Sequence, residues 1–267
     1  MSAVPPMLPY TEEAITQALS PGVFSRPLRF FPMVDSTNER AAELARAGAP
    51  EGTTVVADAQ SSGRGRGDRR WESPPGMGIY LSVVVRPPLD AERATFITSV
   101  AALSACAAAS DEADAACGIK WPNDVLLGGG KVAGILAERG GSGAHAWVVV
   151  GIGVNVNYRR DDFPPPLRGK ATSILLETGR AHCRVRLAAR LLEAFEADYR
   201  VLLGEGPWPL LERLRDASAI LGHRVEIEDG ARRVQGIALD FDERGGLVLG
   251  KGKGREAFYT GSIARVW

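Results

Sequence analysis

The last fifty residues differ in pattern from everything that precedes them. Short strand-like runs follow one another at brief intervals, and Asp229-Gly230 between two of them is typical of a tight hairpin. The runs span residues 224–228, 232–240, 246–250, 256–259 and 262–266. Five short strands in so small a segment predict a small β-barrel, so we place a domain boundary near residues 218–221.

The preceding part of the chain mixes strand-like and helical patterns, which predicts an α+β domain. Strands are expected over residues 28–34, 53–59, 79–86, 119–127, 131–139 and 147–155, and helices over 11–19, 35–48, 91–116, 184–203 and 207–217. Ser36 and Glu39 have the spacing of a capping box at a helix start. Gly128-Gly129-Gly130 indicates a hairpin, and a Pro-rich loop is expected over residues 163–170.

Composition restricts the classes of function. The formal net charge is zero, so nothing indicates bulk attraction to nucleic acid or to a membrane. Three cysteines without a C-x-x-C pair favour a reducing compartment, and three scattered histidines predict no zinc site. We see no signal peptide and no run of 18 apolar residues, and therefore expect a cytoplasmic protein. Only five of the 32 basic residues are lysines, which makes a lysine more informative here than an arginine.

The most unusual stretch is the Gly/Arg loop, defined here as residues 60–71, in which glycines alternate with arginines. Glycine lets a backbone approach a ligand closely, and arginine presents planar donors that match phosphate or carboxylate. The loop could close over an anionic ligand. A solvated basic loop and a nucleic-acid contact are the alternatives.

Three other segments combine polar groups with unusual backbone. Lys120 precedes Trp-Pro-Asn-Asp at a strand end, where its ammonium could face a developing negative charge; Asn123 and Asp124 also suit a plain turn. Gly151 and Gly153 lie inside a predicted strand, which indicates close approach of a ligand or a bulged core strand. Residues 35–38 (Asp-Ser-Thr-Asn) read as a helix N-cap that could also bind a polar ligand.

Taken together and in this order, these segments resemble the biotin protein ligase family. The family shows D-S-T-N, G-R-G-R-x-G-R-x-W, K-W-P-N-D, G-K-x-A-G-I-L and G-I-G-x-N. The matching segments here are residues 35–38, 63–66, 120–124, 130–136 and 151–155. The strand-rich tail is similar to the family's C-terminal domain by pattern alone.

The resemblance implies a mixed β-sheet catalytic domain like that of class II aminoacyl-tRNA synthetases, over residues 28–218. It also implies an SH3-like C-terminal domain over residues 219–267, after an N-terminal extension of residues 1–27. The implied reaction has two halves. The carboxylate of biotin attacks the α-phosphorus of ATP to give biotinyl-5′-AMP, and a lysine of a carboxylase's biotin carboxyl carrier domain then takes the acyl group. Magnesium is expected with ATP, and its ligands are not identified.

The resemblance also implies roles for individual residues. The expected catalytic residues are Lys120, Arg64 and Arg66, which would neutralise two mutually repelling anions. Biotin is expected to contact Ser36, Thr37, Asn38, Gln60, Gly63, Arg64, Gly65, Arg66, Lys120, Gly134, Gly151 and Gly153. ATP and the adenylate are expected to contact Arg64, Arg66, Trp71, Lys131 and Asn155.

Two departures from the family pattern stand out. Asp68 replaces a loop glycine, and Gly67 stands one place earlier than the pattern has it. Fewer than 30 residues precede the first predicted strand, too few for the DNA-binding winged helix of some relatives, so we expect no DNA partner and no repressor function. A monomer and a homodimer both stay open.

Two rival functions also stay open. The first is a lipoate or octanoate ligase or transferase of the same fold. The second is a noncatalytic nucleic-acid binder, which the zero net charge and the absence of aromatics interleaved in the loop disfavour.

Overall fold

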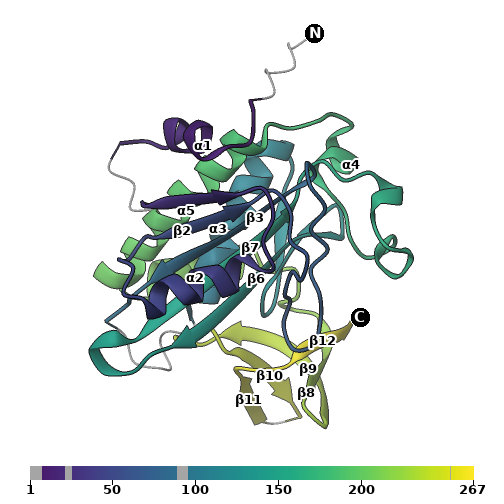
Figure 1. Cartoon of the computed structure of the whole chain (residues 1–267). Helices are drawn as coiled ribbons and strands as arrows, with labels where there is room; N and C mark the ends of the chain where they lie inside the picture. Colours follow the sequence, from purple (N-terminus) through teal and green to yellow (C-terminus); the bar gives the residue numbers. More distant parts are fainter. Residues whose placement is uncertain (1–7, 22–25, 89–95, 253) are drawn as a thin grey trace.

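A seven-stranded mixed sheet forms the centre of the protein in the computed structural model, which describes residues 8–21, 26–88, 96–252 and 254–267 (Figure 1). The order across the sheet is β1-β2-β3-β7-β6-β5-β4, with β1 and β2 parallel and every other neighbouring pair antiparallel. The strands are β1 (Leu28–Phe31), β2 (Thr54–Ala57), β3 (Gly78–Val85), β4 (Cys117–Lys120), β5 (Asp124–Leu127), β6 (Gly130–Gly140) and β7 (Trp147–Asn155).

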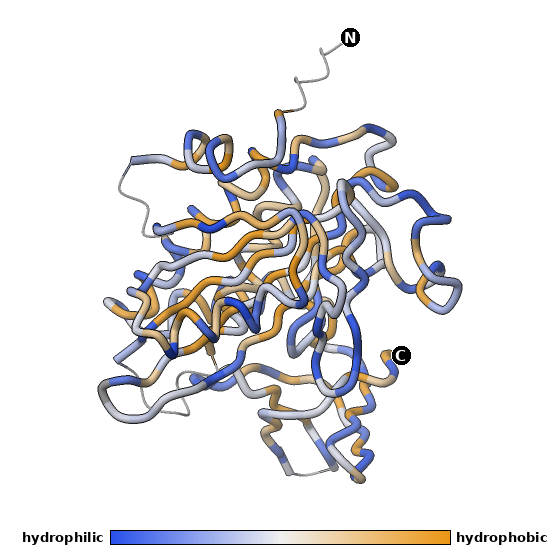
Figure 2. The backbone as a smooth tube through the Cα atoms, in the orientation of Figure 1, coloured by the Kyte–Doolittle hydropathy of each residue, from blue (hydrophilic) through white to orange (hydrophobic). Residues whose placement is uncertain are grey.

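Helices cover both faces of this sheet, which is why all eight residues of β3 are buried. Alanines of α2 (Thr37–Arg46) pack on one face, against Val55, Val84 and Val149. The other face carries α3 (Ile97–Ala113) and α5 (Arg184–Gly204), and α1 (Glu12–Ala18) packs beside α5. Figure 2 shows apolar residues along the central strands and polar residues at the periphery. Among the described residues, no helix is both long and apolar enough to cross a membrane.

The C-terminal segment forms a separate antiparallel sheet in the order β11-β10-β9-β8-β12 (Figure 1). Its strands are β8 (Arg224–Asp229), β9 (Arg232–Phe241), β10 (Leu247–Lys251), β11 (Gly254–Phe258) and β12 (Ser262–Val266), after α6 (Trp208–Asp216). The indole Nε1 of Trp121 donates to the carbonyl of Gly245 at 3.1 Å, and Arg215 pairs with Asp240 at 2.6 Å. These bonds hold the second sheet against the first domain.

Three local predictions were wrong. The strand expected over residues 119–127 is two strands, β4 and β5, because Pro122 and its neighbours form a turn between them. The Ser36 side chain makes no capping hydrogen bond, and Glu39 pairs instead with Arg46 and Arg64, so the capping box does not form. The loop expected over residues 163–170 contains one short helix, η4 (Pro165–Leu167). Outside that loop, the sequence pattern also missed η2 (Gly143–His145), η3 (Arg160–Asp162) and α4 (Ile174–Thr178).

The described part of the helix expected over residues 91–116 runs from Ile97 to Ala113 as α3. Its expected first residues, 91–95, lie outside the described residues, as do 1–7 and 22–25 of the N-terminal extension.

Candidate functional site

A cavity of about 600 Å³ opens on the face of the central sheet that also carries α2. Its floor is formed by the middle of β6 and β7, and its rim by the Gly/Arg loop, the turn between β4 and β5, and residues 163–171. The predicted site residues that line it are Ser36, Thr37, Asn38, Gln60, Arg64, Gly65, Arg66, Trp71, Lys120, Lys131, Gly134, Gly151, Gly153 and Asn155. Gly63 is the one predicted residue outside this lining.

The glycines of the cavity floor make room for protein side chains. A Cβ added to Gly151 would lie 2.0 Å from Asn38 Oδ1, and one on Gly153 would lie 2.5 Å from the Trp71 ring. A Cβ on Gly134 would also meet Trp71, at 2.9 Å. The glycines therefore let Asn38 and Trp71 lie flat against the strands, and these two side chains shape the cavity.

A buried network of polar side chains forms one end of the cavity. Gln60 Oε1 accepts hydrogen bonds from the backbone N–H and the hydroxyl of Thr37, at 2.8 and 3.2 Å. Ser82 Oγ lies 2.8 Å from Thr37 Oγ1 and 2.6 Å from Asn38 Oδ1. The Asn38 amide in turn donates to Glu138 Oε2 at 2.8 Å. Each polar group is fixed by its neighbour, so this end presents donors and acceptors in set directions to a ligand.

The Gly/Arg loop folds back on itself as a narrow hairpin. The N–H of Trp71 donates to Gly63 O at 3.0 Å, and that of Gly65 donates to Arg69 O at 2.8 Å. Gly63 is buried where a Cβ would lie 2.3 Å from the Trp71 carbonyl, so its role in this structure is to permit the hairpin. Gly67 has φ +65° at the tip, and Asp68 beside it is exposed. The displaced glycine thus supplies the left-handed turn residue.

The two predicted loop arginines have different partners. Arg64 forms ion pairs with Glu138 at 2.7 Å and with Glu39 at 3.3 Å. Arg66 donates to the carbonyl of Gly261 in the C-terminal domain. Burial, together with the nearby charge of Arg69, lowers the pKa of Arg66. Arg66 therefore connects the cavity rim to the second sheet.

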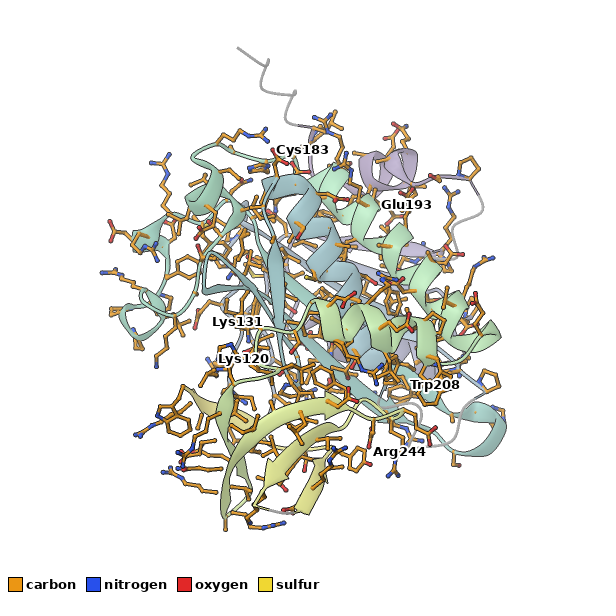
Figure 3. All side chains as sticks on the ribbon, turned by 180° about the vertical axis from the view of Figure 1, so that it is seen from behind. Lys120, Lys131, Cys183, Glu193, Trp208 and Arg244 are labelled. Carbon is orange, nitrogen blue, oxygen red and sulfur yellow. The ribbon has the colours of Figure 1, made fainter. Side chains whose placement is uncertain are left out.

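Lys120 and Lys131 also line the cavity, close to the junction of the two sheets (Figure 3). Lys131 Nζ is 2.5 Å from Asp124 Oδ1 and 5.3 Å from the Trp71 ring centroid. Among the described residues, no carboxylate forms an ion pair with Lys120. The Lys120 ammonium is thus available to an anionic ligand, whereas Lys131 is already paired.

Trp71 and Asn155 form the other end of the cavity. The Asn155 amide donates to the carbonyls of Thr172, at 3.0 Å, and Lys131, at 3.3 Å. The Trp71 indole N–H is buried without a hydrogen-bond partner among the described residues. A buried unpaired donor is costly, and a ligand that accepts from it would relieve that cost. Together with the ring face, this end suits a flat polar group.

Comparison with known proteins agrees with this geometry. Residues 30–155 match the model of the biotin/lipoate A/B protein ligase family, and residues 220–266 match that of the biotin protein ligase C-terminal domain. The curated biotin--[acetyl-CoA-carboxylase] ligase of Mycobacterium tuberculosis is 37% identical over 243 residues, which cover 88% of each chain. The chain belongs to the biotin protein ligase family.

Two further relatives span most of the chain. The bifunctional ligase/repressor BirA of Bacillus spizizenii is 34% identical over 95% of this chain and 78% of its own length. Among solved structures, a biotin protein ligase from Aquifex aeolicus in complex with biotin and ATP superposes with a TM-score of 0.77 at 28% identity. That alignment covers 90% of this chain and 98% of the Aquifex chain. The expected ligase fold, with an α+β catalytic part and a C-terminal antiparallel sheet, is confirmed.

The family motifs quoted above do not include Tyr80 and Tyr158, which line the cavity, or Glu138, which bonds to two residues that line it. Glu138 bridges Asn38 and Arg64. Alternate residues of a strand share a face, so Glu138 lies on the same face of β6 as Gly134 and Leu136. That spacing is the sequence signal that could have identified Glu138 as a site residue. The hydroxyls of Tyr80 and Tyr158 lie 2.6 Å apart. Burial raises the pKa of both phenols, so they stay neutral. No sequence signal marked them.

Proposed function

We propose that this protein is an ATP-dependent ligase that forms biotinyl-5′-AMP and transfers biotin to a protein lysine. The observation that supports it best is the meeting of cations from three separate motifs at one cavity: Arg64 and Arg66, Lys120, and Lys131. Arg64 adjoins the polar end through Glu138, which also binds Asn38, and Lys131 adjoins the other end, 5.3 Å from the Trp71 ring centroid. This order fits a molecule with a ureido ring at one end, a nucleoside at the other, and negative charge between.

In the first half-reaction both reactants are anions. The biotin carboxylate must approach the α-phosphorus of ATP, and the cavity offsets their repulsion with fixed positive charge. We propose that Lys120, whose ammonium has no carboxylate partner among the described residues, contacts the carboxylate and the phosphate as the new bond forms. Arg66 would exchange its bond to Gly261 for one to the phosphates. Pyrophosphate then leaves.

The product of this step is a mixed anhydride that water would hydrolyse. We propose that the Gly/Arg loop and residues 163–171, which form the rim, exclude water while the intermediate waits for its acceptor. In the second half-reaction the neutral amine of the acceptor lysine attacks the acyl carbon, an amide bond forms, and AMP leaves with the electron pair.

At the two ends of the cavity, Ser36, Thr37, Asn38 and Gln60 would bind biotin, and Trp71, Lys131 and Asn155 would contact the adenylate. Magnesium would enter with ATP as the counter-ion of the triphosphate. Among the described residues, no group of three or more His, Cys, Asp or Glu side chains could hold a metal ion by itself.

We infer that the acceptor is the biotin carboxyl carrier domain of acetyl-CoA carboxylase or a related enzyme, since the Mycobacterium tuberculosis relative is named for that carboxylase. Cytoplasmic location, the absence of a DNA partner, and the monomer or homodimer state stay predictions.

The experiment is a comparison of acids in pyrophosphate exchange. We expect biotin, and not lipoate or octanoate, to drive exchange of labelled pyrophosphate into ATP. Incubation of a carrier domain with ATP, biotin and this protein should then add one biotin to that domain, measured by mass spectrometry. Exchange driven by lipoate alone would replace this proposal with the rival of the same fold.

A further inference from the structure

The segment that carries Trp71 is held at every residue, although it belongs to no helix or strand. Residues 71–74, called here the Trp71 segment, each have a backbone carbonyl that accepts a hydrogen bond. Ser73 Oγ donates to the Trp71 carbonyl at 3.0 Å, and the backbone N–H of Gln60 donates to the Ser73 carbonyl at 3.0 Å. Gln60 Nε2 also donates to Ser73 Oγ at 2.8 Å. Gln60, at the polar end of the cavity, thus holds the segment at two points.

The other two donors are the hydroxyls of the buried tyrosine pair. The Tyr158 hydroxyl lies 2.9 Å from the Glu72 carbonyl, and the Tyr80 hydroxyl lies 3.0 Å from the Pro74 carbonyl. The two hydroxyls are also 2.6 Å apart, so their two hydrogens serve three contacts. Tyr80 can donate either to Pro74 or to Tyr158, whereas among the described residues only Tyr158 donates to the Glu72 carbonyl. The orientation of the Glu72 carbonyl therefore depends on Tyr158.

Tyr158 is itself held firmly in the wall of the cavity. None of its surface is exposed to solvent. Its ring stacks on Phe163, with the ring centroids 4.9 Å apart, and Ser173 Oγ donates to its backbone carbonyl at 2.6 Å. Phe163 belongs to the rim segment of residues 163–171. Tyr158 thus joins that rim segment to the Trp71 segment, and it can act on a ligand through the residues that it holds.

We propose that Tyr158 is a positioning residue for the nucleotide half of the substrate, because its bond to Glu72 fixes the direction in which the Trp71 ring points. This inference rests on the proposed function. The Trp71 indole N–H has no hydrogen-bond partner among the described residues, so no polar contact of the ring itself sets its orientation. The ring depends on its backbone and on the glycine floor beneath it. Small errors in placing a substrate-binding group are costly for a reaction between two bound molecules.

The experiment compares Tyr158→Phe with the unchanged full chain. The substitution removes the hydroxyl and keeps the ring that stacks on Phe163. In biotin-dependent pyrophosphate exchange, we expect the KM for ATP to rise about five- to tenfold with kcat nearly unchanged, because a buried carbonyl loses its donor. The KM for biotin should change by less than about twofold, since Gln60 is held by Ser73 and Thr37 without Tyr158.

A second measurement needs no substrate. Deuterium should enter the backbone amides of residues 71–77 faster in Tyr158→Phe than in the unchanged chain, as measured by mass spectrometry of the peptides. The loss of an anchoring hydrogen bond makes local opening of a segment less costly. This result would show that the hydroxyl holds the Trp71 segment whatever the ligand is.

Two further variants make the comparison specific. Ser73→Ala should raise the KM for ATP and the KM for biotin together, because Ser73 Oγ contacts both the Trp71 carbonyl and the Gln60 amide. The matched control is Tyr199→Phe, which also removes a hydroxyl from a buried tyrosine: Tyr199 donates to Glu51 Oε1 at 2.6 Å from α5 and lies outside the cavity lining. This control should leave both KM values and the deuterium uptake of residues 71–77 unchanged.

Three kinetic results would overturn the role of Tyr158: an unchanged KM for ATP in Tyr158→Phe, an equal rise in its KM for biotin, or the same changes in Tyr199→Phe. Unchanged deuterium uptake in residues 71–77 of Tyr158→Phe would overturn it as well. A failure of the proposed function is distinct, since the unchanged protein would then show no biotin-dependent pyrophosphate exchange at all.

Discussion

At the scale of single residues, the site depends on which cations are already paired. Arg64 binds two glutamates, Arg66 a carbonyl, and Lys131 an aspartate, whereas Lys120 has no such partner among the described residues. A ligand must compete for the paired cations and can contact Lys120 without such competition. Lys120 is therefore the group whose loss should affect the chemistry most directly.

Replacing Lys120 with Ala should lower biotin-dependent pyrophosphate exchange about 100-fold or more, because a positive charge at the reacting phosphate is lost. Circular dichroism and the unfolding midpoint should stay close to those of the unchanged protein. Lys251→Ala, at an exposed lysine of the C-terminal domain, is the control and should exchange normally. Normal exchange by the Lys120 variant would remove the role assigned to this side chain.

Glu138 is expected to act by positioning Asn38. Glu138→Gln keeps the shape but loses the charge that orients the Asn38 amide and holds Arg64, so the KM for biotin should rise roughly three- to tenfold with a smaller change in kcat. Glu39→Gln is a matched control, because Glu39 also pairs with Arg64 but has no bond to Asn38. Equal effects of the two substitutions on the KM for biotin would contradict a role through Asn38.

At the scale of elements, β6 and β7 provide a floor from which side chains are missing at alternate positions. Gly134, Gly151 and Gly153 lie on the cavity face, and Asn38 from α2 and Trp71 from the Gly/Arg loop lie over them. The strands thus set the depth of the cavity, and the helix and the loop set its outline. A methyl group added to one of these glycines should displace the Asn38 or Trp71 side chain before it displaces the strands.

Gly151→Ala should displace Asn38, because the new Cβ would lie 2.0 Å from Asn38 Oδ1. We expect a rise in the KM for biotin and a loss of about 1–3 kcal/mol in the free energy of unfolding, typical of overpacking. Isothermal titration with biotin and urea denaturation would measure the two effects. The control is Gly204→Ala in α5, where no atom lies within 4 Å of the added Cβ. It should neither raise the KM for biotin nor lower the free energy of unfolding. Unaltered biotin binding by Gly151→Ala would show that Asn38 can move without cost.

At the scale of the whole molecule, the C-terminal sheet is joined to the catalytic part beside the substrate cavity. Arg66 reaches Gly261, and Trp121, in the motif that also contains Lys120, donates to Gly245. The division into residues 28–218 and 219–267 is still a proposal. The contacts imply that the second sheet supports the rim of the cavity.

Trp121→Phe should lower the free energy of unfolding by about 1 kcal/mol, because the Gly245 carbonyl loses a buried donor while most of the apolar contact is kept. Urea denaturation would measure this loss in the free energy of unfolding. Trp208→Phe is the control, since Trp208 is 59% exposed and should have little effect. A similar loss in both variants would argue against the interdomain bond as the cause.

The sequence by itself was sufficient for the order of the elements, apart from the division of β4 from β5 and the short helices that it missed. It was also sufficient for the change of pattern near residue 218 and for the short motifs at Ser36–Asn38, Gly63–Arg66 and Lys120–Asp124. These depend on local periodicity and on residue types, which the chain carries whatever its fold. Only the tertiary structure decided that the motifs meet at one cavity, that Trp71 and Asn38 fill the space above the glycines, and that Glu138 lies beside Asn38. Contacts between residues distant in sequence follow from how sheets and helices pack, and no local pattern records that packing.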